Sequence, residues 1–368
     1  MNLQLAIVGL PQSGKTTVFN ALTRASAAVG GYSSASDEPN LATVKVPDAR
    51  VPRLSEIFQP RREVYADIRY LDVAGVAKGL GKQGLGGRLL GFLQEASALI
   101  LVVRAFEDAN VPHPEERVDP LRDLDTLLLE LTFSDLGMIE RRLARLDEMI
   151  QKLRGSEREA NEREREILRR CQAALEDDTP LREVELSDLE ARQLRGYGFL
   201  TRKPALVLLN LGENQLGEPG AKLLAEARGR FERPGLAIDA LAANIEMEIG
   251  QLDAEDAELF MADLGIEESS LDRVIRLSYD LLGLITFLTG GPEEVRAWPI
   301  RRGMTAVESA GEVHSDIQRG FIRAEIVAYE DLLSHGSMAE CRKAGVLRVE
   351  GRDYVMADGD VTHFLFNV

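Results

Sequence analysis

Residues 9–17 read Gly-Leu-Pro-Gln-Ser-Gly-Lys-Thr-Thr and directly follow an apolar run that begins at Leu3. This G-x-x-x-x-G-K-T pattern is typical of a P-loop, in which backbone N–H groups converge on phosphate oxygens while the lysine contacts phosphate and the threonine hydroxyl contacts Mg²⁺. We therefore expect a nucleoside triphosphate site, followed by a helix over 18–25 whose N-terminal end faces the phosphates. The predicted phosphate-binding residues are Gln12, Ser13, Gly14, Lys15, Thr16 and Thr17.

A second motif, Asp72-Val73-Ala74-Gly75, ends the apolar run at 68–71. Asp72 is suited to hold Mg²⁺ through water and the Gly75 N–H to sense a γ-phosphate, which is the switch-II arrangement of GTPase-type proteins. The glycines at 75–91 predict a loop that only a bound triphosphate orders, with a plain surface loop as the alternative. Val76 stands where Ras-like enzymes carry the glutamine that orients water, so we expect slow hydrolysis.

A third motif, Asn210-Leu211-Gly212-Glu213, occupies the place of the N-K-x-D motif that reads guanine, but the lysine is absent and the acid is longer. An aspartate there accepts hydrogen bonds from the N1–H and 2-amino groups of guanine, so the change to Glu213 weakens selection for guanine. The amide of Asn210 can contact an adenine edge. The motif favours ATP modestly over GTP.

Composition excludes several classes of function. A formal net charge of −17 opposes general binding to nucleic acid, so we expect no DNA partner and RNA contact only through a local patch. The two cysteines, Cys171 and Cys341, lack C-x-x-C spacing and indicate neither a disulfide scaffold nor a zinc site. No apolar stretch reaches the ~18 residues of a membrane span, and the N-terminal run looks like a core strand and not a signal peptide. A cytoplasmic protein is expected.

The elements that would position these motifs divide into four segments. Residues 1–120 alternate apolar β-type runs, including 98–103, with helical or Gly-rich stretches, as in the parallel sheet of a nucleotide-binding domain. Residues 121–202 are charged and helical. Their apolar residues recur at spacings of three and four, which predicts an antiparallel helical hairpin with a solvated tip near 157–166. This stripe comprises Leu136, Ile139, Leu143, Leu146, Ile150 and Leu153.

The last two segments return to mixed structure. Residues 203–282 resume the nucleotide-binding domain, with strands expected at 203–210 and 236–241 and helices at 254–264 and 270–282. Residues 283–368 show short β-type runs separated by turn signals, which predicts a small α+β module. Its strands are expected at 294–300, 321–327, 346–349 and 361–368.

Several motifs together resemble the Obg-like ATPases, the YchF family, over nearly the whole chain. They are Gly9-Leu10-Pro11, Asp37-Glu38-Pro39-Asn40, Asp72-Val73-Ala74-Gly75, Val102-Val103-Arg104-Ala105-Phe106-Glu107-Asp108, Asn210-x-x-Glu213 and the closing His363-Phe364-x-Phe366-Asn367-Val368. The resemblance implies a GTPase-type α/β domain interrupted by a helical arm and followed by a TGS domain, a ubiquitin-like β-grasp module. It also implies a preference for ATP and association with ribosomes or other translation machinery.

The resemblance also bears on individual residues. His113, in Val111-Pro112-His113-Pro114, reads by itself as a surface-loop histidine, but it matches the place of a histidine to which the family assigns a catalytic role. Ser36 stands where the family has a threonine that joins the metal and the γ-phosphate. Gln12-Ser13 replaces Asn-Val, which removes the asparagine that supports a monovalent-cation site in related proteins, and Leu241-Ala242 replaces a base-contacting Ser-Ala.

These observations lead to one main hypothesis, a nucleotide-dependent switch that binds and slowly hydrolyses ATP with Mg²⁺. Lys15, Gly75 and His113 are the candidate catalytic residues; Thr16, Ser36 and Asp72 would hold the metal; Asn210, Glu213 and Leu241 would contact the base. A scaffold that holds nucleotide with little turnover is the alternative. A metabolic P-loop kinase is disfavoured because no Arg-rich lid follows the P-loop domain.

RNA contact in the C-terminal module is a separate hypothesis. Basic pairs at Arg301-Arg302 and Arg342-Lys343 lie near the aromatic residues Trp298 and Tyr329 in the sequence. Acidic residues are as frequent in the same segment, so a solvated face of mixed charge is the favoured alternative.

Overall fold

The computed structural model describes residues 3–24, 39–73, 87–264, 266 and 269–367. The chain divides into two compact units. The smaller unit is drawn from Met1–Leu3, Thr43–Arg69 and Asp272–Val368, and the larger from Gln4–Ala42 and Tyr70–Leu271. Among the described residues, no helix has both the length and the apolar content needed to cross a membrane.

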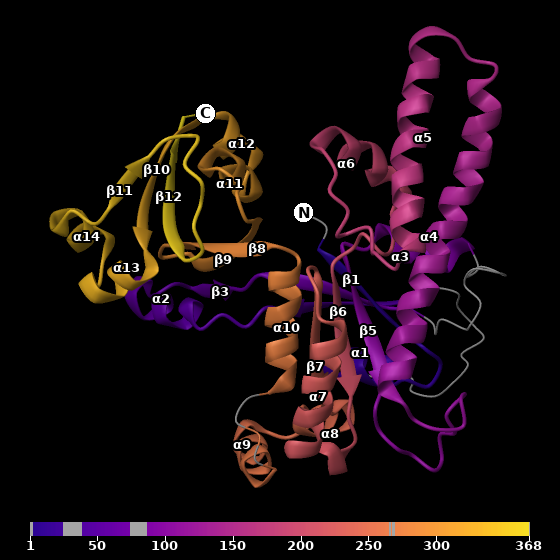
Figure 1. Cartoon of the computed structure of the whole chain (residues 1–368). Coiled ribbons are helices and arrows are strands. Elements are labelled where there is room, and N and C mark those ends of the chain that lie inside the picture. The colour runs from indigo at the N-terminus through magenta and orange to yellow at the C-terminus, as the bar shows by residue number, and fades with distance from the viewer. Residues whose placement is uncertain (1–2, 25–38, 74–86, 265, 267–268, 368) are drawn as a thin grey trace. The chain divides into compact units, whose positions relative to one another are not determined.

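The larger unit is built on a six-stranded sheet of order β2-β4-β1-β5-β6-β7 (Figure 1). The pairs β1–β5, β5–β6 and β6–β7 are parallel. Every residue of β5 and β6 is buried. Strands that are covered on both faces have continuous apolar runs, which is the pattern of these two segments. The predicted α/β class is confirmed. The strands are β1 Gln4–Gly9, β2 Asn40–Lys45, β4 Asp67–Asp72, β5 Ala98–Arg104, β6 Ala205–Asn210 and β7 Leu236–Leu241.

Two helices of this unit, α4 and α7, pack on the sheet through one apolar core, to which α4 contributes Leu124, Leu127 and Leu131 and α7 contributes Ala227 and Phe231. The helices and short 3-10 turns are α1 Lys15–Thr23, α3 Gly87–Glu95, α4 Pro120–Ile150, α5 Gly155–Glu176, α6 Asp188–Leu194, η1 Arg195–Tyr197, η2 Glu213–Gln215, α7 Glu218–Phe231, α8 Ala243–Ile249 and α9 Ala254–Asp263, with α10 Ser270–Leu281 leading out of the unit.

Helices α4 and α5 form the expected hairpin and lie side by side in Figure 1. The Asp119 side chain caps α4 by accepting a hydrogen bond from the Arg122 N–H, and proline follows at the first turn of the helix. Five residues of the predicted stripe, from Leu136 to Ile150, pack against residues of α5 in a second apolar cluster, whereas Leu153 lies beyond the end of α4 and outside that cluster. The tip was placed wrongly, because α5 already begins at Gly155 and the charged stretch 157–166 is helical.

The returning chain is anchored to α4 by a buried carboxylate. Asp135 is fully buried; its Oδ1 accepts a hydrogen bond from the Leu200 N–H at 2.9 Å, and its Oδ2 accepts from the Thr201 N–H at 2.8 Å and the Thr201 hydroxyl at 2.7 Å. Burial raises the pKa of Asp135 to about 6, against the opposing effects of these hydrogen bonds and of Lys203. Lys203 in turn donates to the carbonyls of Gln94 and Ala96 at the end of α3. One buried acid therefore fixes where the insertion ends.

The smaller unit contains a mixed six-stranded sheet of order β11-β10-β12-β8-β9-β3. Helix α11 packs on it over an apolar core in which Phe287 stacks on Trp298 and contacts Phe364 edge-on. Strand β8 was not among the predicted strands. The elements are α2 Arg50–Phe58, β3 Arg62–Val64, β8 Leu284–Gly290, β9 Glu294–Arg301, α11 Ala306–Val313, α12 Ser315–Arg319, β10 Phe321–Ala328, α13 Tyr329–His335, α14 Met338–Ala344, β11 Arg348–Glu350 and β12 Asp360–Phe366.

The division into units differs from the expected segments at residues 43–69 and 272–282, which the sequence places with the nucleotide-binding domain but which fall in the smaller unit. Strand β3 pairs in parallel with β9, with Arg62 opposite Glu294. Arg50 donates to Asp48 and also, at 2.8 Å, to Asp358. A charged three-residue strand carries no recognisable β pattern, and its partner lies more than 200 residues away along the chain, so sequence periodicity alone does not reveal this pairing.

Replacing Asp135 should destabilise the larger unit far more than replacing a half-exposed acid of the same helix. We expect Asp135→Ala to lower the free energy of unfolding by about 3 kcal/mol, because three buried donors lose their acceptor. Urea denaturation monitored by circular dichroism measures this change. The matched control is Asp147→Ala, which removes half-exposed ion pairs with Arg165 and Arg169 and should cost less than about 1 kcal/mol. Equal losses in the two variants would contradict the anchoring role.

Candidate functional site

The P-loop joins β1 to α1 and is shaped by two close approaches. Gly9 passes so near β5 that a Cβ atom would lie 2.4 Å from the Val102 carbonyl oxygen. Gly14 has φ +86°, and a Cβ atom there would lie 2.2 Å from the Asn210 amide nitrogen. Side chains are excluded at both positions, which is the physical reason for the two glycines of the motif. Gln12 also has a positive φ, 60°.

Lys15 lies over this loop. The residue is 8% exposed, and its ammonium group donates a hydrogen bond to the Leu10 carbonyl at 2.9 Å. Burial lowers the pKa of Lys15 to about 8, while Asp72 acts in the opposite direction. A partly desolvated ammonium held inside the loop is poorly compensated, so a polyphosphate would satisfy it better than the single carbonyl does.

The predicted metal ligands Thr16 and Asp72 meet. The Thr16 hydroxyl donates to Asp72 Oδ2 at 2.9 Å, bringing the start of α1 and the end of β4 together. Burial raises the pKa of Asp72, opposed by hydrogen bonds from Thr16 and Asn40 and by the charge of Lys15. Oxygen donors of this kind fit Mg²⁺, which binds few protein ligands and keeps several waters. Ser36, Gly75 and Val76 lie outside the described residues, so their predicted roles stay predictions.

Asn210 joins three parts of the site. Its amide nitrogen donates to the Ser13 carbonyl at 3.2 Å, and its amide oxygen accepts from the Ala243 N–H at 3.2 Å. The residue is 4% exposed. Both ends of the amide are therefore engaged in holding the P-loop against α8, which makes Asn210 a positioning residue in this arrangement.

A cavity of about 670 Å³ opens beside the P-loop at the carboxyl ends of β5 and β6. Ligands of open α/β sheets bind at this edge. Predicted residues Thr17, Asn210 and Glu213 line it. Leu241 does not, because it is buried at the end of β7, where its carbonyl accepts from the Leu211 N–H, and its neighbour Ala242 lines the cavity in its place. The remaining lining residues are Phe106, Glu107, Asp108, Leu211, Gly212, Asn214, Leu216, Asn244, Ile245, Glu248 and Leu264.

Three lining residues that the sequence analysis missed as site residues are Phe106, Asn244 and Glu248. Phe106 belongs to the Val102–Asp108 motif that carried the family resemblance, but its type alone suggests a core residue. Asn244 and Glu248 are exposed and four residues apart on α8, which places them on one face of the helix. The spacing of these two polar residues by four positions was the signal in the sequence that could have indicated a shared polar face.

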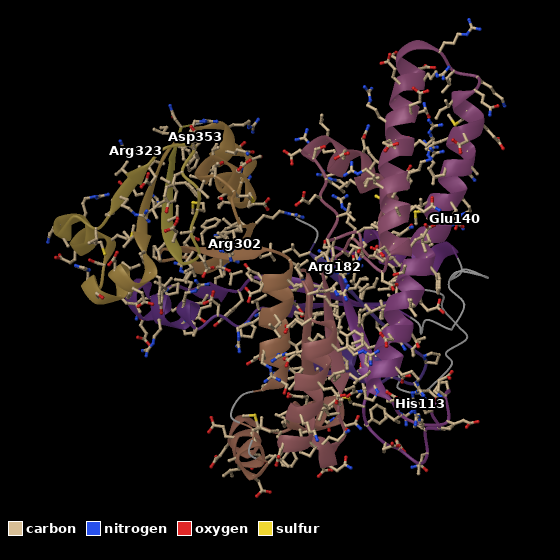
Figure 2. All side chains as sticks on the ribbon, in the orientation of Figure 1. His113, Glu140, Arg182, Arg302, Arg323 and Asp353 are labelled. Atoms are coloured by element: carbon tan, nitrogen blue, oxygen red, sulfur yellow. The ribbon has the colours of Figure 1, made fainter. Side chains whose placement is uncertain are left out.

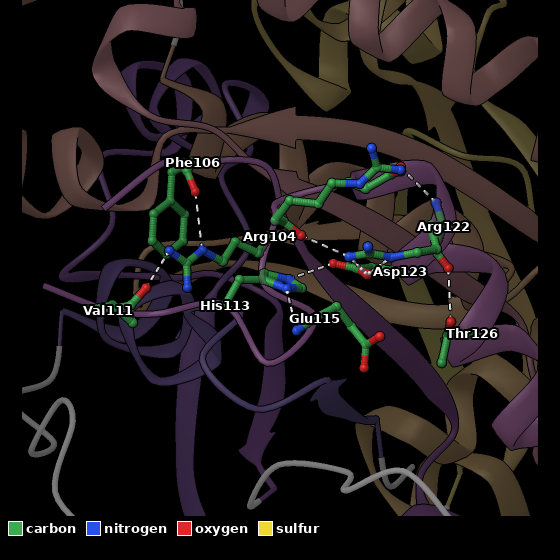
Figure 3. A network of polar contacts seen from close by, with 10 residues as sticks. Arg104, Phe106, Val111, His113, Glu115, Arg122, Asp123 and Thr126 are labelled. Carbon is green, nitrogen blue, oxygen red and sulfur yellow. Dashed lines mark hydrogen bonds and ion pairs between the residues drawn. The ribbon is translucent and has the colours of Figure 1, made fainter. Parts of the chain in front are cut away.

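His113 lies outside this cavity and is buried with both ring nitrogens engaged (Figure 3). Its Nδ1 accepts a hydrogen bond from the Glu115 N–H at 3.1 Å, so the ring proton is on Nε2, which lies 2.8 Å from Asp123 Oδ2. The side chains of His113 and Asp123 are 5% and 4% exposed. Arg122 also donates to Asp123, through Nε and Nη2. Participation of His113 in hydrolysis stays a prediction and would require this pairing to open.

Three features define the GTPase-type class of P-loop protein. They are a P-loop between β1 and α1, a carboxylate at the end of β4 in contact with the P-loop threonine, and an asparagine at the end of β6. The MMR_HSR1 family model, described as a 50S ribosome-binding GTPase, matches residues 4–135. The YchF-GTPase_C model, described as a protein of unknown function, matches residues 284–367. The chain belongs to the YchF family, as the full-length relatives below show.

The curated proteins named "Ribosome-binding ATPase YchF" include one from Bacillus subtilis that is 42% identical and one from Escherichia coli O157:H7 that is 38% identical, each covering 100% of both chains. The solved structure of the Schizosaccharomyces pombe YchF GTPase aligns with a TM-score of 0.84 at 32% identity, covering 99% of this chain and 98% of that one. These likenesses confirm the predicted family and fold.

Removing the P-loop ammonium should separate nucleotide binding from folding. We expect Lys15→Ala to weaken binding of a Mg²⁺–nucleoside triphosphate by at least about 100-fold, because a charge-assisted contact with phosphate is lost. Isothermal titration calorimetry measures the affinity, and thermal unfolding checks that the fold is kept. Lys222→Ala, an exposed lysine on α7, serves as the control and should leave the affinity unchanged. Unaltered binding by the Lys15 variant would refute the assignment.

Proposed function

We propose that this protein is a nucleotide-dependent switch that binds and slowly hydrolyses ATP with Mg²⁺ and acts on the ribosome. The observation that carries the proposal is the buried Lys15, with the Thr16–Asp72 contact, next to a large cavity at the carboxyl edge of the sheet. Full-length similarity to proteins named ribosome-binding ATPases supports the choice of nucleotide and partner.

The proposed arrangement assigns each group a task. Lys15 would leave the Leu10 carbonyl and bind phosphate, and the backbone N–H groups of residues 12–17 would surround the phosphate oxygens. Thr16 and Asp72 would hold Mg²⁺, Thr16 directly and Asp72 through water, and the ion would neutralise developing charge on the phosphates. The cavity between Phe106 and α8 would take the base.

The lining of the cavity favours adenine. Asn210 is committed to Ser13 and Ala243, so its amide does not select the base in this arrangement. Glu213 is exposed at the cavity, where three further carboxylates, those of Glu107, Asp108 and Glu248, also lie. Carboxylates accept from the 6-amino group of adenine and repel the O6 acceptor of guanine, although the N1–H and 2-amino groups of guanine offset part of that repulsion.

Two observations support slow turnover. Val76 in the sequence cannot orient water, and His113 is held by Asp123 and the Glu115 N–H. The alternative function, a scaffold that holds nucleotide with little turnover, differs from the switch in one respect. In the switch a partner releases the restraint on His113, and in the scaffold no partner does. No observation favours the kinase alternative.

The proposed RNA contact of the C-terminal unit has narrow support. Lys343 pairs with Glu340 and Arg342 with Glu325, so these two basic residues are neutralised locally. Arg301 and Arg302 are exposed. Figure 2 labels Arg302, Arg323 and the acidic Asp353 on this unit, consistent with mixed charge. The Arg301-Arg302 pair is therefore the candidate contact, and most of the support for a ribosomal partner comes from the relatives.

Affinities for the two purine nucleotides test the base assignment. We expect ATP to bind more tightly than GTP, and Glu213→Asp, which restores the shorter acid, to reduce the ratio by about tenfold or less. Competition of both nucleotides against a fluorescent analogue, with Mg²⁺ present, measures the two constants. Glu232→Asp, on the surface away from the cavity, is the control. A strong preference of the wild type for GTP would overturn the assignment.

Single-turnover hydrolysis with and without ribosomes separates the switch from the scaffold. We expect a slow intrinsic rate that ribosomes accelerate by at least about tenfold, because a partner can supply or free the missing catalytic group. Quenched-flow measurement of released phosphate from bound ATP gives both rates, and ribosomes with Lys15→Ala provide the background. If ribosomes bind the protein but leave the rate unchanged, the scaffold is the better description.

A further inference from the structure

The proposed function assigns no task to Arg104, the last residue of β5, although its side chain holds a neighbouring segment in place. The residue is 3% exposed. Its Nε donates to the Phe106 carbonyl at 3.1 Å and its Nη2 to the Val111 carbonyl at 2.7 Å, and both contacts are visible in Figure 3. The guanidinium carbon also lies 4.5 Å from the centre of the Phe106 ring. One side chain thus fixes two points of the segment that connects β5 to α4.

The first of these points belongs to the base cavity. Phe106 lines it, and the Phe106 N–H donates to the Asn210 carbonyl at 3.1 Å. A ring atom of Phe106 lies 3.6 Å from where a Cβ of Gly14 would be, so the ring reaches the P-loop. Aromatic rings are good stacking surfaces for bases. A base in this cavity would contact the same residue that Arg104 holds through its ring and its carbonyl.

The second point belongs to the His113 segment. Val111 precedes His113 by two residues, and its carbonyl is held by the same guanidinium. Arg104, His113 and Asp123 line a second, small cavity of about 10 Å³, together with Pro11 and Ser13 of the P-loop. Arg104 Nη1 and Ser13 Oγ are buried without a hydrogen-bond partner among the described residues. The volume suits a single water, which would offer these two atoms a hydrogen-bond partner and connect the P-loop to this network.

We propose that Arg104 is a positioning residue that couples the base cavity to the His113 segment. A base that packs on Phe106 restrains Arg104, and Arg104 restrains the Val111–His113 backbone, so the position of His113 depends on whether a base is bound. This inference rests on the proposed function. It also explains how the base, and not only the polyphosphate, would affect the rate of hydrolysis.

The test compares Mg²⁺–ATP with Mg²⁺–tripolyphosphate, which can occupy the P-loop without filling the base cavity. We expect Arg104→Met, which keeps the approximate volume but removes the donors, to weaken ATP binding by about tenfold and tripolyphosphate binding by less than about threefold. The kcat for ATP should also fall by about tenfold. Arg104→Lys, with its charge and a single donor group, should recover part of both losses.

A double-mutant cycle tests whether Arg104 acts through Phe106. If it does, Phe106→Leu and Arg104→Met together should weaken ATP binding little more than either change alone, because the two residues act as one unit. Arg182→Met is the matched control: Arg182 also donates to a backbone carbonyl, that of Thr201, but lines neither cavity. It should affect ATP and tripolyphosphate equally.

The outcomes distinguish the two proposals. Failure of the wild type to bind ATP would refute the proposed function. Binding by the wild type, with equal losses for ATP and tripolyphosphate in Arg104→Met or an unchanged kcat, would refute the coupling alone. Should Arg104→Met fail to fold, Arg104→Lys decides on the same comparison, since it is expected to lose ATP affinity and not tripolyphosphate affinity.

Discussion

The hydrogen bonds of the Asn210 side chain are the interaction on which the rest of the site depends. They connect the P-loop at Ser13 to the start of α8 at Ala243, and they do so where Gly14 leaves no room for a side chain. A buried amide with both ends paired resists displacement, because breaking either bond leaves an unsatisfied group in a medium of low dielectric constant. The P-loop and the wall of the large cavity beside it are therefore held in one fixed relation.

The same principle recurs at two other buried polar residues of the larger unit. Arg104 holds the segment between β5 and α4, and Asp135 holds the chain where it returns from the helical hairpin. Each uses a side chain on a regular element to satisfy backbone groups of an irregular segment, as buried backbone groups require. Long insertions are tolerated because such contacts fix the points at which they leave and rejoin the sheet.

His113 shows how a residue can match a functional motif and yet be restrained. Its ring is satisfied by Asp123 and by the Glu115 backbone, next to the P-loop but outside the large cavity. Asp123 belongs to α4, the helix that continues into the hairpin. His113, Asp123 at the start of α4 and Arg104 at the end of β5 thus belong to one polar network. The proposed switch would have to move these parts together.

The sequence by itself determined the P-loop, the parallel strands, the hairpin stripe and the family, because these depend on local spacing and on apolar periodicity. Only the tertiary structure decided that β3 belongs to the smaller unit, that Leu241 lies behind the cavity, and that Phe106, Asn244 and Glu248 line it. These outcomes depend on contacts between residues far apart in the chain. The hydrogen bonds of buried side chains such as Asn210 and Arg104 produce no periodic pattern in a sequence. Each set of bonds needs only one residue of the right type at one position.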